Sequence, residues 1–287
     1  FQSSLSSKNI YENFLMEIIK SQADLISKWM SAGFIHGVMN TDNTCLSGET
    51  IDYGPCAFMD TFDYNKVFSS IDYQGRYSYK NQPNIMLWNL TRFAETILPL
   101  IDTDVNKSIK KAEELLGEFT QIYENFWVTK MCSKLGIVNE KKSDKILIEE
   151  FLNLLHTKQL DFNNSFYSLS FLLENDRSNI KTTSKNFQFL NKIESSDWYQ
   201  KWKHRLSFEN NNNKDLIKVL LKNNPSIIPR NHFVEKILNQ VIETNDKKSL
   251  TNYLIELNKP NKIRSFDDPL TFAPLSSEEV LQTFCGT

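Results

Sequence analysis

Three residues between positions 36 and 55 have side chains that can move a proton and hold a divalent cation. The segment reads HGVMNTDNTCLSGETIDYGP and contains Asp42, Asn43 and Asp52. Mg²⁺ prefers oxygen ligands, so an amide oxygen and a carboxylate, completed by nucleotide phosphates, make an adequate site. A further carboxylate could serve as general base, a role that contributes about 10²–10⁴-fold to a rate. These residues predict group transfer from a nucleotide, with Asn43 and Asp52 as metal and nucleotide ligands and Asp42 as catalytic base.

The order of these residues is similar to that of a protein kinase catalytic loop, with one difference. Kinase loops read H-x-D-x-x-x-x-N, in which the Asp is the base and the Asn holds Mg²⁺, and a D-F-G signature follows. Counting from His36 places Val38 in the Asp position and Asn43 in the Asn position, and Asp52 leads an Asp-Tyr-Gly. Valine cannot accept a proton, so Asp42 is the obvious substitute. We expect His36 to hold the loop through backbone hydrogen bonds.

Turn formation would explain the same residues without any chemistry, because Asn and Asp bond to their own backbone and tolerate left-handed conformations. The combination of a helix, His-Gly, Asn43 and a following Ile-Asp-Tyr-Gly favours function over a simple turn. The later segment QGRYSYKNQP, residues 74–83, could face a substrate. We favour a structural role there, in which Arg76 and two tyrosines pin an irregular loop to the helices beneath it.

The elements that must position the loop follow from hydrophobic periodicity. Residues 9–31 predict a helix that Gly33 ends, and TCLSGETIDYG predicts a small hairpin ending at Asp52. Residues 58–83 predict an extended, irregular loop. The fold class predicted is therefore mostly α, with a small β-hairpin at the catalytic loop.

Further helices are predicted after this loop. Residues 85–98 predict a buried helix with Trp88 and Phe93 in the core and Pro99 as terminator, and residues 105–135 predict one long amphipathic helix. The remaining predicted helices span residues 143–156, with Ser143 as N-cap, and residues 162–174, 197–207, 214–223, 230–243 and 247–257.

Composition excludes several classes of protein. The chain has 33 Lys and Arg against 35 Asp and Glu, a net charge of −2, which argues against a nucleic-acid binder. No apolar run approaches the roughly 20 residues of a membrane-spanning helix, so we expect a soluble protein. Four cysteines without a C-x-x-C pair favour a reducing compartment. No Walker or G-x-G-x-x-G loop is present in the 287 residues.

Longer stretches of the sequence resemble the selenoprotein O family of kinase-like pseudokinases. The similarity is dense over residues 33–95, in GFIHGVMNTDN, TIDYGPCAFMDTFD and QGRYSYKNQPNIMLWNLTRFAE, and weaker in NPSIIPRNHFVEKIL and the ending FCGT. It implies a kinase-like C-terminal lobe over residues 1–135, a helical extension over 136–258 and an extended tail over 259–287. Cys285 is the best candidate for a redox-active residue in that tail, although the ending Cys-Gly-Thr departs from the family's pattern.

The resemblance also implies a protein adenylyltransferase, which transfers AMP from ATP to Ser, Thr or Tyr hydroxyls of proteins. Asp42 matches the family's proposed base, and Asn43 and Asp52 match its ligands for Mg²⁺, with Mn²⁺ as an alternative. The partners implied are ATP and protein substrates, without nucleic acid or membrane, in mitochondria of eukaryotes or the cytoplasm of bacteria.

The family's N-terminal half, with its glycine-containing loop and its Lys and Glu ion pair, has no counterpart in these residues. The sequence also begins with Phe1 and not with Met, so we expect that Phe1 is not a natural start. We therefore expect the chain to be the C-terminal portion of a longer protein, without the N-terminal lobe, and to be inactive or nearly so by itself. Two other functions stay open: an ordinary ATP-dependent phosphotransferase, against which Val38 argues, and a non-catalytic helical binding module.

Overall fold

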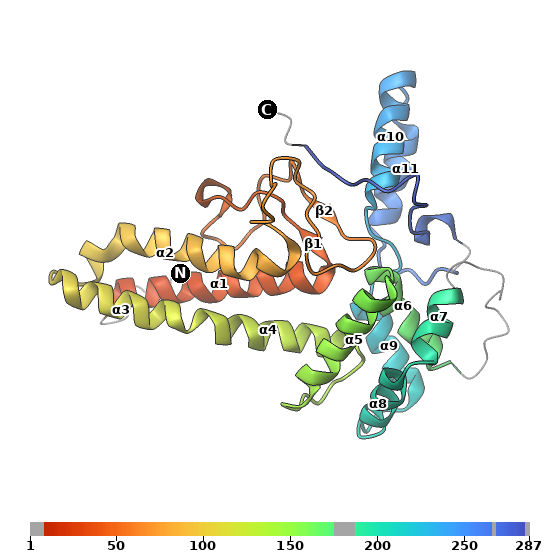
Figure 1. The fold of residues 1–287 in the computed structure, drawn as a ribbon, viewed down its shortest axis with the longest axis horizontal. Helices are drawn as coiled ribbons and strands as arrows, with labels where there is room; N and C mark the ends of the chain where they lie inside the picture. The colour runs from red at the N-terminus through yellow and green to blue at the C-terminus, as the bar shows by residue number, and fades with distance from the viewer. Residues whose placement is uncertain (1–8, 175–186, 266–267, 285–287) are drawn as a thin grey trace. The chain divides into compact units, whose positions relative to one another are not determined.

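The chain is built mainly from helices (Figure 1). The computed structural model describes residues 9–174, 187–265 and 268–284. In that part of the chain the strands are β1 (Phe34–Ile35) and β2 (Ala57–Phe58), which make up its small β element. The prediction of a mostly helical chain with little strand is confirmed.

The β element is not where the sequence placed it. Residues 44–56 contain turns but no strand, so the predicted hairpin within the loop is wrong. Carbonyl groups that a hairpin would pair are bound by side chains of the preceding helix instead. The amide nitrogen of Gln22 donates to Cys45 O at 2.6 Å, and the hydroxyl of Ser21 donates to Ser47 O at 3.2 Å.

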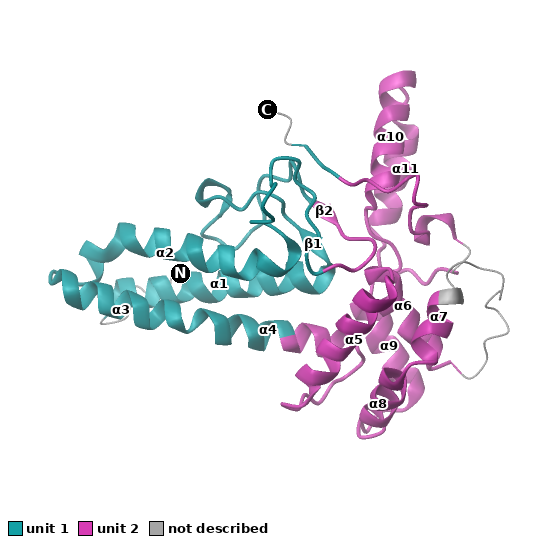
Figure 2. Ribbon diagram, viewed as in Figure 1, with its two compact units in different colours: residues 1–56, 64–127, 282–287 teal, residues 57–63, 128–281 magenta. Residues whose placement is uncertain are grey.

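The described chain divides into two compact units (Figure 2). Unit 1 carries the loop with all three predicted site residues, and unit 2 carries most of the later helices. The division falls within helix α4, after Trp127. Unit 1 comprises residues 1–56, 64–127 and 282–287, and unit 2 comprises residues 57–63 and 128–281.

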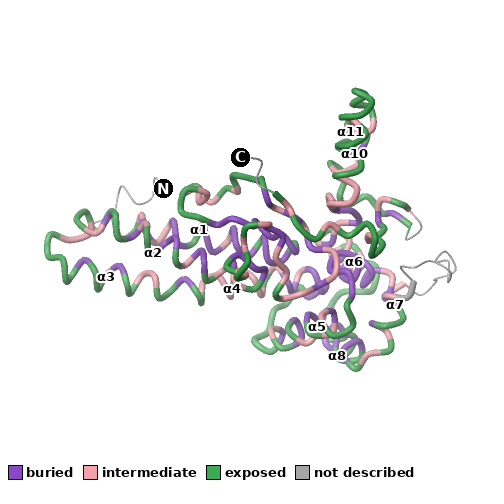
Figure 3. Tube along the Cα trace, turned by 45° about the horizontal axis from the view of Figure 1, so that its top comes forward, coloured by how far each residue is buried: buried purple, intermediate pink, exposed green. Residues whose placement is uncertain are grey.

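Three helices of unit 1 pack against one another: α1 (Ile10–Ala32), α2 (Gln82–Ile101) and α3 (Val105–Gly117). Helix α1 ends as predicted, since Gly33 adopts the left-handed conformation at φ 69° and its N–H reaches the last carbonyls of the helix. Helix α1 is buried along most of its length because it faces both α2 and the loop (Figure 3).

Two predictions about α2 are wrong. The helix continues through Pro99 to Ile101, because a proline this close to the end of a helix removes only one of its last hydrogen bonds. Trp88 is also not in the core, since 41% of it is exposed. The 3.6-residue period places Trp88 beside buried Asn89, and the two side chains leave the helix in different directions.

The long helix predicted over residues 105–135 is broken into α3 and α4 (Phe119–Lys134). Gly117 ends α3, and the N–H of Glu118 bonds to the carbonyl of Leu115 in a tighter turn. Glycine weakens a helix, and Phe119, the first residue after the break, is only 1% exposed. Periodicity does not detect such a break because the apolar pattern resumes after one residue.

Unit 2 is a set of shorter helices, most of them predicted. Ser143 precedes α5, but its side chain makes no capping bond, so the predicted N-cap is wrong. Side-chain caps occur instead at Asp161 before α6, Ser196 before α8 and Asn212 before α9. The helices are α5 (Asp144–Lys158), α6 (Phe162–Leu172), α7 (Phe187–Glu194), α8 (Asp197–Leu206), α9 (Asn213–Asn223), α10 (Asn231–Thr244) and α11 (Lys248–Leu257), of which α7 was not predicted.

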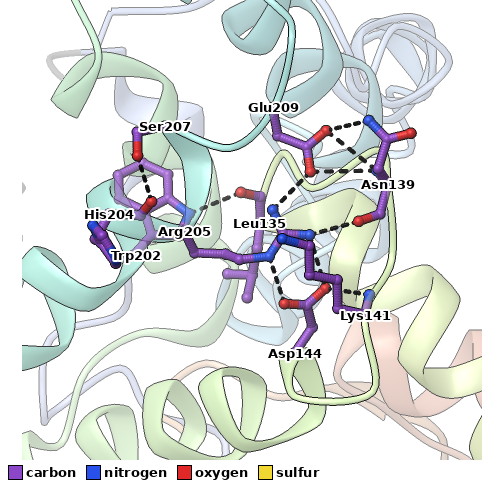
Figure 4. A network of polar contacts seen from close by, with 9 residues as sticks. All are labelled: Leu135, Asn139, Lys141, Asp144, Trp202, His204, Arg205, Ser207 and Glu209. Carbon is purple, nitrogen blue, oxygen red and sulfur yellow. Dashed lines mark hydrogen bonds and ion pairs between the residues drawn. The ribbon is translucent and has the colours of Figure 1, made fainter.

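A buried ionic network joins α5 and α8 to the segment before α5 (Figure 4). The guanidinium of Arg205 donates to Asp144 Oδ1 at 2.6 Å, to Glu209 Oε1 at 2.9 Å and to the carbonyl of Asn139 at 2.6 Å. Glu209 in turn accepts from the backbone N–H of Asn139. Each charged group in the network is therefore paired, which buried charges require.

A second buried guanidinium, that of Arg230, lies between Asp60 and Asp161. Asp161 also caps α6, so one cluster fixes the start of α6, the segment after β2 and the entry to α10.

Among the described helices, none combines the length and the apolar character that a membrane span requires.

The described part of the tail after Asn258 is mostly extended, as predicted, apart from a short 3₁₀ turn at Pro269–Thr271. Near its end it returns to unit 1 and pairs with residues far away in the sequence. Ser70 N–H bonds to Thr283 O at 3.0 Å, and Thr283 N–H bonds to Phe68 O at 2.7 Å. Cys285 lies outside the described residues.

Candidate active site

The predicted catalytic loop leaves the core of unit 1 at Asn40. His36, Val38 and Met39 are 0%, 8% and 2% exposed, so the first part of the loop is an interior segment. Residues Thr41–Asn43 then form a short 3₁₀ turn on the surface, with Asp42 exposed. The carboxylate proposed as base is accessible from solvent, while the valine in the usual base position is packed inside.

The amide of Asn43 has a defined orientation. Its Nδ2 donates to the carbonyl of Val38 at 3.1 Å, which closes the loop on itself. That bond uses a donor of the amide and directs Oδ1 away from Val38. An amide held in this way presents an oxygen, which is the kind of ligand that Mg²⁺ binds.

His36 ties the loop to the Asp-Tyr-Gly segment. Its backbone N–H donates to Gln82 Oε1 at 3.0 Å, and its ring Nε2 lies 2.8 Å from the carbonyl of Ile51. The centroid of its ring lies 5.2 Å from that of the Trp29 ring. Burial lowers the pKa of His36, so the neutral imidazole is favoured. The structural role expected for His36 is confirmed.

Asp52 follows the carbonyl that His36 holds, and its backbone is unusual. Its φ is 55°, in the left-handed region, which few residues other than glycine adopt. Asp and Asn tolerate this region better than most residues, and such backbone at an exposed acid is typical of ligand-binding positions. Asp42, Asn43 and Asp52 thus lie on one loop segment of unit 1, with Asp52 fixed through Ile51 and His36.

Four supporting residues of this loop come from α1 and α2 and were missed in the sequence. Asn89 donates to Met39 O at 3.1 Å and to Thr44 Oγ1 at 2.8 Å, on either side of the exposed turn. A usable signal exists, because an amide on the apolar face of a predicted helix needs a partner in the interior. The four residues are Gln22, Trp29, Gln82 and Asn89, which bond respectively to Cys45 O, Thr50 Oγ1, Phe34 O and Met39 O.

Gly37 is required where the catalytic loop approaches Pro55, the residue after Asp-Tyr-Gly. Its φ is 88°, and a Cβ there would lie 2.7 Å from the carbonyl oxygen of Pro55. Only glycine allows this conformation and this approach together. The loop and the segment after Asp-Tyr-Gly are therefore in direct backbone contact.

The residues present fit a divalent cation only as part of its ligand set. In the part of the chain that the structure describes, no group of three or more His, Cys, Asp or Glu could hold a metal ion. Asn43 Oδ1 and the Asp52 carboxylate could supply two oxygen ligands at most. Water and nucleotide phosphates would have to complete the coordination, as they commonly do around Mg²⁺.

A cavity of about 300 Å³ lies beside the exposed turn. Its polar lining includes Thr41 and Thr44, which flank Asp42 and Asn43, and Arg92 of α2. Its apolar lining comes from Ile18, Leu46, Leu90 and Phe93.

The segment 74–83 is pinned to the helices, as expected. Tyr79 is 2% exposed and donates to the carbonyl of Met30 at 2.6 Å, and burial raises the pKa of Tyr79. Tyr77 donates to Asn40 Oδ1 at 2.6 Å, which links this segment to the loop two residues before Asp42. Arg76 covers the ring of Trp88 on α2, with its Cζ 4.9 Å from the ring centroid.

The half-buried thiol of Cys56 follows the Asp-Tyr-Gly-Pro segment. Burial raises the pKa of Cys56 to about 11, so the thiol is protonated near neutral pH. A protonated thiol is a weak nucleophile, and we assign Cys56 no role in the group transfer considered for this loop.

Comparison with known proteins matches almost the whole chain to one family. The family model described as protein adenylyltransferase SelO matches residues 1–258. A protein nucleotidyltransferase YdiU of Clostridium perfringens is 44% identical over 291 aligned positions, which cover 100% of this chain and 56% of that relative. A protein of the same name from Clostridium botulinum is 43% identical, with the same coverage. The chain spans about half the length of the curated relatives it matches. By the extent of both matches, the chain belongs to the protein adenylyltransferase SelO family.

Proposed function

We propose that this chain carries the catalytic loop of a protein adenylyltransferase that transfers AMP from ATP to Ser, Thr or Tyr hydroxyls of proteins. The observation that carries the proposal is the orientation of Asn43, whose amide nitrogen bonds to Val38 O and whose oxygen is left to bind a ligand. The exposed Asp42 is next to it, and Asp52 is fixed through Ile51 and His36. Family membership supports the choice of AMP over phosphate.

In the proposed reaction, Asp42 accepts the proton of the substrate hydroxyl. The hydroxyl oxygen bonds to the α-phosphorus of ATP, the bond to the bridging oxygen breaks, and pyrophosphate leaves. Asn43 and Asp52 would hold Mg²⁺, with Mn²⁺ as an alternative, and that ion would supply charge neutralisation at the phosphates. The side chains of His36 and Asn89 hydrogen-bond to backbone carbonyls of the loop and keep it in one geometry, and such catalysis depends mainly on fixed geometry.

The proposal includes a kinase-like C-terminal lobe over residues 1–135, followed by a helical extension. The order of the elements supports it: a helix, a loop with the base and one ligand, and an Asp-Tyr-Gly with the second ligand. Because the relatives named above are bacterial, we propose the bacterial cytoplasm as the compartment.

Intact-mass spectrometry of the full-length enzyme with ATP, Mg²⁺ and a protein acceptor tests the function. A gain of AMP on the acceptor is expected. A gain of phosphate on the acceptor would indicate an ordinary phosphotransferase instead. If neither the acceptor nor the enzyme itself gained AMP or phosphate, the result would favour a binding module.

Variants of the loop test the roles of its residues. Asp42→Asn should lower the rate by about 10²–10⁴-fold, as loss of a general base does. Asp52→Ala should abolish transfer, because it removes a proposed ligand of Mg²⁺. Glu113→Gln, an exposed acid of α3 in the same unit, is the matched control and should transfer AMP like the unchanged enzyme. Full activity of Asp52→Ala with an unchanged melting temperature would contradict the ligand assignment.

A further inference from the structure

Two arginines and a tryptophan form an exposed group next to the loop. The Cζ atoms of Arg76 and Arg92 lie 4.9 Å and 5.6 Å from the ring centroid of Trp88. Trp88 is 41% exposed, and Arg76 is also exposed. We call Arg76, Trp88 and Arg92 the cationic shelf.

The charge of the cationic shelf is only partly neutralised. Arg92 forms an ion pair with Glu95 at 2.7 Å. Arg76 has no carboxylate partner in the described part of the chain, where its guanidinium contacts the rings of Trp88 and Tyr77. The nearest acid along the chain, Asp72, accepts from the backbone N–H groups of Arg76 and Tyr77 at 2.8 Å and 2.7 Å. Among the described residues, the guanidinium of Arg76 is therefore exposed and has no ion-pair partner.

The contact with Trp88 leaves the Arg76 guanidinium able to bind an anion. A cation–π contact uses the charge of the guanidinium and not its N–H donors, which form a fork that matches a carboxylate. The ring also limits the rotamers of the arginine, so less conformational entropy is lost when an anion binds. The carboxylate of Asp72 accepts a hydrogen bond from the Arg76 N–H and so also restricts the backbone of Arg76.

The cationic shelf is anchored to the same loop as the proposed base. Tyr77, next to Arg76, donates to Asn40 Oδ1 at 2.6 Å. Asn89, next to Trp88, bonds to Met39 O and Thr44 Oγ1 on either side of the exposed turn. Arg92 lines the same cavity as Thr41 and Thr44, which flank Asp42 and Asn43.

We propose that the cationic shelf binds an acidic side chain of the protein substrate, close in the sequence to the hydroxyl that receives AMP. The inference rests on the proposed function, and it adds a preference for hydroxyls with Glu or Asp nearby. Charge complementarity supports an acidic partner, and the anchoring to the loop supports a segment that also reaches Asp42.

Steady-state kinetics with matched peptides test this preference. Two peptides carry one Ser acceptor and differ only in having Glu or Gln on both sides of it, and the enzyme is the full-length protein. The KM of the Glu peptide should be about tenfold lower than that of the Gln peptide, as expected for a charge-assisted arginine–carboxylate pair. Arg76→Gln should bring this ratio close to one through KM rather than kcat, and Arg76→Lys should give an intermediate ratio.

A matched control separates the shelf from overall charge. Lys110→Gln removes an exposed cation of α3, in the same unit, that makes only a 4.0 Å ion pair with Glu114. It should retain the activity and the peptide preference of the unchanged enzyme. An equal loss of preference in Lys110→Gln, or a rise in the KM for ATP in Arg76→Gln, would overturn the proposal, because the shelf would then act through bulk charge or bind the nucleotide.

Direct binding distinguishes failure of the shelf from failure of the proposed function. Fluorescence anisotropy of the labelled Glu peptide, without ATP, should show weaker binding to Arg76→Gln than to the unchanged protein, and less binding at high salt. Arg76-dependent binding without AMP transfer would retain the shelf and reject the adenylyltransferase. AMP transfer with equal binding of both peptides would reject the shelf alone.

Discussion

At the scale of single residues, the site depends on which atoms hydrogen bonds leave available. Asn43 uses its amide nitrogen on Val38 O, and His36 directs Nε2 to Ile51 O. Side chains that are already bound in this way need little reorganisation when a ligand arrives, which favours charge stabilisation in group transfer. The exposed Asp42 lies on a 3₁₀ turn whose two sides are held by Asn89.

Gly37→Ala should damage this arrangement. The new Cβ would lie 2.7 Å from Pro55 O, and the residue would have to adopt a φ of 88°. We therefore expect the free energy of unfolding to fall by about 1–3 kcal/mol and the rate of AMP transfer to fall as well. The measurements are urea unfolding and the rate of transfer. Gly117→Ala is the control, because a Cβ at the end of α3 meets nothing within 4 Å, and it should be neutral or stabilising by up to about 1 kcal/mol. Equal stability of both variants would contradict the close approach at Gly37.

At the scale of elements, polar groups in unit 2 decide how the helices meet. Arg205 and Arg230 are each surrounded by carboxylates from other segments. Lys134, the last residue of α4, is different. It is 6% exposed, has no carboxylate partner in the described residues, and has its Nζ 4.5 Å from the ring centroid of Phe166 on α6.

Lys134 should make the stability of the protein rise with pH. Burial lowers the pKa of Lys134 from 10.5 to about 7, so between these values the unfolded chain binds a proton that the folded chain has released. The free energy of unfolding should therefore increase from pH 7 toward pH 10.5, by up to about 1.4 kcal/mol per pH unit. Urea unfolding at several pH values measures this slope.

Lys134→Met provides the test. The variant should be more stable than the unchanged protein at pH 7, and the difference should shrink as the pH rises. Lys201→Met removes an exposed lysine that pairs with Glu150 at 2.6 Å, and it should keep the original slope. A difference between Lys134→Met and the unchanged protein that does not vary with pH would refute the assignment.

At the scale of the whole molecule, segments far apart in the sequence complete the unit that carries the site. Residues 282–287 are grouped with unit 1, although more than 150 intervening residues belong to unit 2. Thr283 exchanges backbone hydrogen bonds with Phe68 and Ser70, and its hydroxyl donates to Pro55 O. Pro55 is the residue that Gly37 approaches, so the tail and the loop meet at one carbonyl.

Ending the chain at Leu281 should loosen this region. Loss of Thr283 O removes the acceptor for Ser70 N–H, and amide exchange at Ser70 should become about tenfold faster or more. Hydrogen exchange followed by mass spectrometry measures it. Thr283→Val removes only the hydroxyl bond to Pro55 and should keep the protection of Ser70. Unchanged exchange in the shortened chain would show that the tail pairing contributes nothing to local stability.

The sequence by itself determined most helices and the chemistry of the loop. Apolar residues at helical spacing and terminators such as Gly33 are local features, and they located α1 and most helices of unit 2. The types and spacing of Asp42, Asn43 and Asp52 indicated a base and two ligands, and the family comparison confirmed the resemblance.

Only the tertiary structure decided what surrounds those residues. The hairpin predicted in the loop is absent because side chains of α1 take its carbonyl groups, and Trp88 is exposed because α2 turns Asn89 toward the loop instead. The partners of Arg76 and Thr283 could not be predicted either. Such contacts join residues that are distant in the chain, and their energy depends on burial and geometry that local pattern does not contain.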